Sequence, residues 1–282
     1  MMARLAALVA AAALPLIATA HQGVTPMALY VDAPSSALVG RDYTVTVDEM
    51  RVPVTTVSRG PQLLSAIVLL DVSDSRRMGP VVEIRQLGGV AHPGDTVRIG
   101  TFADRVVIGS TAIVDGASAA QAEREVTQAG GASPLWDAIC ASVDALREAG
   151  GLRVVVVFSD ALPTANDRGF DETYDIAVHA GVMVSVIGIA DEALRFSSQM
   201  TSQMHVIGRN DNLRRLARDT GGEYAELRTP MEEPTPVLVG QLHRLRARTR
   251  LGFLPPVRDG ALHRVSVALD GRPIGGPVWM RF

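Results

Sequence analysis

Five oxygen-bearing side chains stand at positions where they could bind a divalent cation. Asp71, Ser73 and Ser75 alternate directly after an apolar run. Ser133 precedes a predicted helix, and Asp160 follows a second apolar run. Two carboxylates and three hydroxyls form an all-oxygen ligand set, which suits Mg²⁺ or Mn²⁺ and carries too few charges for a tight calcium cage. Such a site keeps waters and leaves a coordination position open for an incoming carboxylate.

The elements that must position these side chains are buried parallel strands. Three nearly continuous apolar runs are typical of strands covered on both faces. They lie at 63–70, 152–158 and 182–189. Helical patterns alternate with them, which predicts an α/β fold with a doubly wound, mostly parallel sheet. Ligands bind beyond the carboxyl ends of the strands in such sheets, and Asp71 and Asp160 stand at those ends.

Antiparallel strands are expected at one sheet edge and at both ends of the chain. Segments 96–102 and 105–108 predict a hairpin that adds one antiparallel edge strand to the sheet. Segments 44–48 and 52–57 alternate as strands do, joined by a turn at Glu49-Met50-Arg51. Strands are also expected after a C-terminal helix, at 249–254, 262–269 and 277–282. We expect the two terminal β segments to pack together as one accessory unit.

The first twenty residues have the pattern of a secretory signal peptide. A short positive start at Arg4 precedes an apolar run that ends in Ala18-Thr-Ala20, the small residues that a signal peptidase cuts. The apolar run is shorter than the roughly 20 residues a spanning helix needs, and Pro15 interrupts it. We therefore expect a secreted or periplasmic protein, with no transmembrane segment after cleavage.

The chain is expected to divide into five parts. A cluster of three prolines marks the one clear linker. The parts are a signal peptide (1–20), an N-terminal β extension (21–62), an α/β domain (63–228), the linker (229–236) and a C-terminal helix and β segment (237–282).

Composition and missing motifs exclude several classes of protein. Of the 282 residues, 47% are apolar and 20% charged, with a formal net charge of −3, so the chain folds and has no basic footprint for nucleic acid. Cys140 is the only cysteine, which excludes an intrachain disulfide, and its helical surroundings predict a buried, inert thiol. The sequence around Ser133 lacks the final Gly of the Gly-x-Ser-x-Gly motif of serine hydrolases. No Gly-rich dinucleotide-binding motif follows an early strand. We therefore expect no enzymatic activity.

Four arginines alternate where the C-terminal helix passes into a strand, and two interpretations of them remain open. They are Arg244, Arg246, Arg248 and Arg250. They could form an anion or partner site, but a solvated strand face is the commoner outcome and is favoured here.

The five candidate ligands, taken in order, resemble the metal-ion-dependent adhesion site of the von Willebrand factor A (VWA) family. Asp71, Ser73 and Ser75 match its Asp-x-Ser-x-Ser, Ser133 stands in the place of its Thr, and Asp160 matches its final Asp. The resemblance covers about 63–227, and the flanks resemble a bacterial subgroup, the acidobacterial-type VWFA-related proteins. It implies a Rossmann-like VWA fold, a bound Mg²⁺ (or Mn²⁺ or Ca²⁺) and a protein partner that supplies an Asp or Glu.

Three residues depart from the family pattern near the site. Arg76 and Arg77 place two cations beside the expected metal, which weakens its binding, and Ala161 replaces the usual Gly after the last Asp. The alternative interpretation is therefore a scaffold with a vestigial metal site, which binds through its β extension or its Arg-bearing strand.

Overall fold

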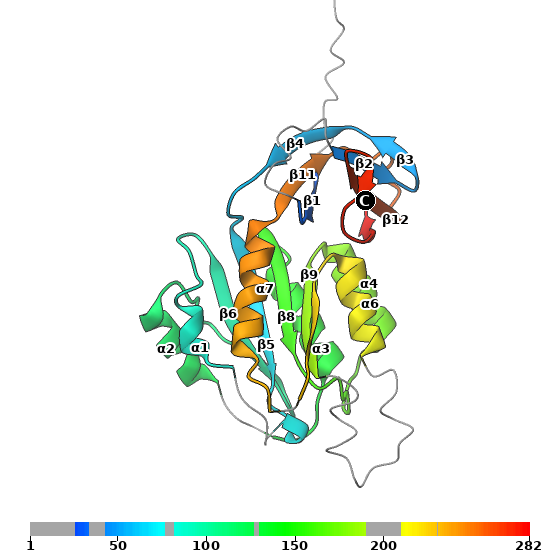
Figure 1. The fold of residues 1–282 in the computed structure, drawn as a ribbon. Coiled ribbons are helices and arrows are strands. Elements are labelled where there is room, and N and C mark those ends of the chain that lie inside the picture. Colours follow the sequence, from blue (N-terminus) through cyan, green and yellow to red (C-terminus); the bar gives the residue numbers. More distant parts are fainter. Residues whose placement is uncertain (1–25, 34–42, 77–81, 127–129, 190–209, 230) are drawn as a thin grey trace, which may run out of the picture.

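The computed structural model describes most of the chain. The described ranges are 26–33, 43–76, 82–126, 130–189, 210–229 and 231–282. The predicted signal peptide, residues 1–20, lies outside them, as does the start of the N-terminal β extension. Figure 1 shows an α/β body with a separate layer of β strands above one end of its sheet.

Six strands form the central sheet of the body, in the order β10-β9-β8-β5-β6-β7. They are β5 (Leu64–Asp71), β6 (Thr96–Phe102), β7 (Val106–Ile108), β8 (Leu152–Phe158), β9 (Met183–Ile189) and β10 (Tyr224–Leu227). Among these described strands, only β7 runs antiparallel to its neighbour. Every residue of β5 and β9 is buried, as expected for strands covered on both faces. The predicted doubly wound sheet with one antiparallel edge strand is thus confirmed.

Helices cover both faces of this sheet. One face packs against α1 (Ile84–Leu87), α2 (Gly116–Glu125) and α7 (Thr235–Ala247), and the other against α3 (Leu135–Leu146), α4 (Phe170–Ala180) and α6 (Asp211–Thr220). Successive residues of β5 alternate between the two cores, Val68 in one and Leu69 in the other. Helix α7 begins within the predicted linker 229–236, because Pro236 is tolerated in the first turn of a helix.

The strands from the two ends of the chain pair with one another in a β unit. One sheet contains β1 (Met27–Val31), β11 (Thr249–Phe253) and β4 (Val54–Ser58). The other contains β2 (Tyr43–Val47), β3 (Met50–Val52), β12 (Leu262–Leu269), β13 (Arg272–Pro273) and β14 (Val278–Arg281). Because β1 pairs with β11 and β2 with β12, and all pack on one apolar core, the expected accessory unit is present.

The N-terminal hairpin differs from its predicted form at two places. Its turn consists of Asp48 and Glu49, both with positive φ, and not of residues 49–51. Such two-residue turns match the twist of the paired strands. The predicted strand 52–57 is also divided at Pro53, so that β3 stays with β2 while β4 pairs with β11. Proline has no N–H to donate to a ladder, and it marks the point where the chain changes sheets.

The expectation of a solvated arginine face is wrong for Arg246 and Arg248, which are both buried. Arg246 pairs with Asp95 and donates to the carbonyl of Val90 at 2.6 Å. Arg248 pairs with Asp32 at 3.0 Å. The two residues lie where α7 leads from the body into the β unit, and the carboxylates opposite them supply the compensation that a buried charge needs.

Two further features are the environment of Cys140 and the lengths of the helices. Cys140 is buried and its thiol lies 3.4 Å from the Thr173 hydroxyl; burial raises the pKa of the thiol. In the described part of the chain, no helix has the length and apolar character needed to cross a bilayer.

Candidate metal centre

The first part of the candidate site is a tight turn at the end of β5. Asp71 is its last residue and is buried. Its Oδ1 accepts hydrogen bonds from the backbone N–H of Ser73 at 3.1 Å and from the Ser73 hydroxyl at 2.6 Å. The Oγ atoms of Ser73 and Ser75 are 3.0 Å apart. This Asx-type turn places three oxygen-bearing groups on one loop.

The second loop approaches Asp71 from the start of α3. The buried Ser133 hydroxyl donates to Asp71 Oδ2 at 3.4 Å, a long hydrogen bond. Backbone bonds hold the two loops together, since Gly130 N–H donates to the Val72 carbonyl and Asp74 N–H to the Gly131 carbonyl. Gly131 has φ of 96°, and a Cβ there would collide with the Asp104 carboxylate. Glycine is therefore required at this approach.

The third loop follows β8 and contributes Asp160 and a residue that the sequence analysis missed. The fully buried Ser159 donates its hydroxyl to Asp71 Oδ2 at 2.7 Å, a shorter bond than that from Ser133. Ser159 Oγ also accepts the N–H of Ala161, at 3.1 Å. Asp160 is buried, and its Oδ1 accepts the N–H of Leu162 at 3.2 Å.

Ala161 adopts the left-handed conformation, with φ of 58°. This conformation is one that glycine takes at no steric cost, so the alanine stores strain beside the site. At this position, where the family pattern has Gly, the backbone therefore adopts a conformation typical of glycine although the residue is alanine. The hydrogen bond from its N–H to Ser159 is one of the contacts that fix this path.

The second and third loops are joined by side chains that the sequence analysis also missed. Thr164 Oγ1 accepts the N–H of Ser133 at 2.8 Å, and Thr164 N–H donates to the Ser133 carbonyl. Asn166 Oδ1 accepts the N–H of Trp136 at 2.7 Å. Pro134 at the N-cap of α3 offers no side-chain acceptor, so the neighbouring loop supplies it.

The predicted residues thus gather at one end of the sheet. Hydrogen bonds connect Asp71, Ser73, Ser75 and Ser133 directly, and Asp160 is adjacent to the Ser159 that bonds Asp71. One signal in the sequence pointed to Ser159, because it is a polar residue at the end of a buried apolar run. Thr164 and Asn166 had no such signal, because their role depends on how two loops meet. Arg76 and Arg77 are expected to place two cations beside the metal. Arg77 and the side chain of Arg76 lie outside the described part of the structure.

The donor set fits a hard divalent cation. Asp71 is 5% exposed and, within the described residues, makes no ion pair, so its charge is held by hydroxyl and N–H donors alone. A buried carboxylate is costly without a positive partner. In the same ranges no group of three His, Cys, Asp or Glu side chains is arranged for a metal, so a cation here would depend on serine oxygens. Oxygen ligands of this kind suit Mg²⁺.

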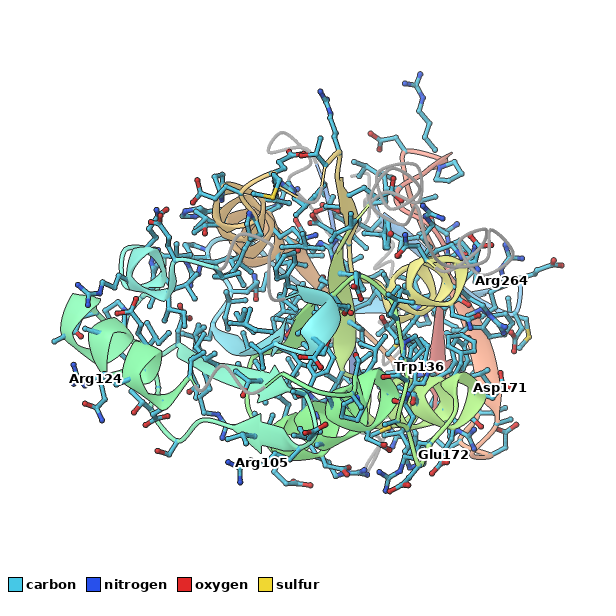
Figure 2. All side chains as sticks on the ribbon, turned by 90° about the horizontal axis from the view of Figure 1, so that it is seen from below. Arg105, Arg124, Trp136, Asp171, Glu172 and Arg264 are labelled. Carbon is cyan, nitrogen blue, oxygen red and sulfur yellow. The ribbon has the colours of Figure 1, made fainter. Side chains whose placement is uncertain are left out.

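The surface around this end carries charges of both signs. Figure 2 looks onto it and shows Arg105 along the lower edge of the view, with Asp171 and Glu172 toward its right. All three residues are exposed. Trp136, in contrast, is buried at the start of α3 and packs edge-on against Phe170, with ring centroids 5.6 Å apart.

Comparisons with known proteins find likeness among solved structures alone. No family model matches the chain, and the search of curated proteins returns no significant match. An aerotolerance-related membrane protein from Bacteroides fragilis NCTC 9343 aligns with 14% identity and a TM-score of 0.46, over 64% of this chain and 98% of that chain. The SpRpn10 VWA domain aligns with 15% identity and a TM-score of 0.39, over 64% and 94%.

A third solved structure is the vWF domain of the type V pili tip protein Mfa5 from Porphyromonas gingivalis. It aligns with 10% identity and a TM-score of 0.45, over 66% of this chain and 95% of that domain. The strand order and the two helical layers establish the fold independently of these alignments. Domains described as VWA or vWF are thus among the structures to which this chain is similar.

Proposed function

We propose that this chain is an exported, non-enzymatic protein-interaction module that binds a divalent cation and, through it, a partner's Asp or Glu. The cation is Mg²⁺, with Mn²⁺ or Ca²⁺ as alternatives, and its ligands are Asp71, Ser73, Ser75, Ser133 and Asp160. The observation that carries the proposal is the buried Asp71 carboxylate, which gathers hydroxyls from three loops. The cation would supply a positive charge and an open coordination position to which the partner's carboxylate could bind.

Each residue has a separate part in this proposal. Asp71 and Asp160 supply the negative charge that holds the ion, and Ser73, Ser75 and Ser133 supply neutral oxygens. A hydroxyl can rotate its proton away, so an oxygen that now donates to Asp71 can turn a lone pair to a cation. The two carboxylates formally balance the charge of a divalent ion, so a partner's Asp or Glu would be favoured as a hard oxygen ligand for the open coordination position.

Thermal unfolding with and without metal tests the site. We expect Mg²⁺ to raise the Tm of the wild-type protein relative to EDTA, because an ion that binds only the folded state stabilises it. Asp71→Ala and Asp160→Ala should remove the difference. Asp144→Ala is the matched control, since Asp144 is an exposed carboxylate on α3. Equal Tm values for wild type in Mg²⁺ and EDTA would reject the metal and favour the vestigial scaffold.

Elution from an affinity column separates the two modes of partner binding. Partners captured from the extracytoplasmic fraction should elute with EDTA if a cation bridges the proteins. Elution by salt alone would indicate exposed charges instead. Arg246 and Arg248 are poor candidates for such charges, since both are buried and paired within the chain.

A further inference from the structure

Two abutting cavities lie where the β unit meets the α/β body, and we refer to them together as the junction groove. Their volumes are about 310 and 280 Å³, and they share Leu29, Tyr30 and Val278. The body contributes the starts of β8 and β9, at Leu152 and Met183. The groove is therefore at the amino ends of the parallel strands, opposite the candidate metal centre. Figure 1 shows the β unit above this end of the sheet.

The junction groove follows the edge of β1 and not its face. Successive side chains of a strand point to opposite sides, so a cavity on a sheet face is lined by alternate residues. Here every residue from Pro26 to Asp32 lines one cavity or the other. Within the described ranges β1 pairs with β11 alone. Its second row of backbone N–H and C=O groups therefore borders the groove.

A second strand edge borders the same groove. Val278, Trp279 and Met280 of β14 are also consecutive lining residues, and in the described part of the chain β14 pairs with β12 alone. Proteins usually protect such edges with charged residues or proline, because a bare edge accepts another strand. β1 has neither within Met27–Val31.

The charged residue that lines the smaller cavity indicates the chemistry of the segment that the groove could bind. Among the residues that the structure describes, Arg153 is the only charged one that lines the smaller cavity, whose other lining is mostly apolar. Its guanidinium donates to the carbonyls of Arg147 at 2.6 Å and Gly181 at 3.3 Å. No carboxylate in the described residues pairs with it. An occupant with apolar side chains and one acidic group would complement this end of the groove.

We propose that the junction groove binds an extended segment of a partner protein by β-strand addition. The segment's backbone pairs with the outer edge of β1, its apolar side chains lie against Leu152 and Met183, and one Asp or Glu pairs with Arg153. Main-chain hydrogen bonds supply affinity in this mode, and alternate side chains supply specificity. The interaction needs no metal and is separate from the proposed cation site.

Selection from a phage-displayed library of random octapeptides, on the purified protein in EDTA, tests this proposal. We expect enriched peptides to alternate apolar and polar residues and to carry an Asp or Glu. In hydrogen exchange, the bound synthetic peptide should slow amide exchange in 27–31 and 278–281. Methylating the peptide's backbone nitrogens should abolish binding, because the donors to the strand edge are then lost.

Charge variants test the role of Arg153. Arg153→Glu should weaken binding of the enriched peptide by about tenfold, as expected for loss of a hydrogen bond between charged groups. Arg98→Glu is the matched control and should leave binding unchanged, since Arg98 is also a strand arginine bonded to a backbone carbonyl but lies outside the groove. Changing the peptide's Glu to Gln should reproduce the loss without altering the protein's fold.

Three results would overturn the proposal. The first is a selection that enriches no acidic, strand-like peptide. The second is a peptide-induced slowing of amide exchange that maps outside β1 and β14. The third is a slowing of amide exchange in β1 that increases with protein concentration when no peptide is present. The last would show a second copy of the chain at the edge.

Discussion

At the scale of single residues, the site is built around the Asp71 carboxylate. Three hydroxyls from three loops donate to its two oxygens, and all three belong to buried serines. The carboxylate is therefore oriented before any cation arrives. Orientation in advance reduces the cost of binding, because side chains that are already fixed lose little freedom.

Ser159→Ala should destabilise the protein, because it removes a buried hydrogen bond to a carboxylate. The expected loss is about 2 kcal/mol in unfolding free energy, typical for a hydrogen bond to a charged group. Ser142→Ala is the matched control. Ser142 is equally buried, but its hydroxyl bonds the neutral carbonyl of Ala138. Its loss should be smaller, about 1 kcal/mol or less.

Urea unfolding without metal measures both variants. Equal losses for Ser159→Ala and Ser142→Ala would show that Ser159 has no special relation to Asp71. A Mg²⁺ titration of folded Ser159→Ala adds a second measure, since a displaced Asp71 should bind the ion more weakly.

At the scale of elements, the sequence predicts where the strands lie far better than which strands pair with one another. Buried strands such as Leu152–Phe158 are indicated by continuous apolar runs, and the structure places them as expected. The missed elements have weaker signals: α1 has four residues, and α2 contains few large apolar side chains. The division of the N-terminal hairpin at Pro53 depends on β11, which lies about two hundred residues away in sequence. Local patterns cannot specify such a pairing.

Within the β unit, His263 connects the β2–β3 turn to the start of β12. Its Nδ1 is 2.6 Å from an Asp48 oxygen and its Nε2 is 3.0 Å from an Asp259 oxygen. The ring stacks on Phe282, with centroids 4.7 Å apart. Hydrogen bonds to Asp259 and Asp48 raise the pKa of His263 above its ordinary value of 6.5. Hydrogen bonds from Arg264 N–H and His263 lower the pKa of Asp48.

The stability contributed by this contact should depend on pH. A raised pKa of His263 in the folded state stabilises the protein fully below pH 6.5, and this contribution is lost as pH rises through the raised value. The lowered pKa of Asp48 contributes above its ordinary value of 3.8 and is lost as pH falls through the lowered one. His263→Gln should therefore be most destabilising, relative to wild type, between these ordinary values.

Denaturation curves at several pH values measure this difference. His179→Gln is the control, since His179 is an exposed residue in the last turn of α4. A destabilisation by His263→Gln that stays constant from acidic to alkaline pH would show that the ring acts by packing on Phe282 and not by charge.

At the scale of the whole molecule, the chain has two ends with different chemistry. The carboxyl end of the sheet gathers Asp71, Asp160 and serine hydroxyls, and this edge could be predicted from the sequence because parallel strands end together. The amino end meets the β unit and contains the junction groove, which no sequence pattern indicated. A groove between units arises only from their packing, and Arg248, bonded to Asp32 and Gly221, fixes that packing.

The central claim is that Asp71 and its neighbours hold one divalent cation. Equilibrium dialysis of the purified protein against Mg²⁺, with the bound metal counted by elemental analysis, tests it most directly. We predict one Mg²⁺ per chain for wild type and for Asp144→Ala, and none for Asp71→Ala. Folded wild-type protein that retains no Mg²⁺, or an Asp71→Ala variant that retains as much as wild type, would contradict the claim.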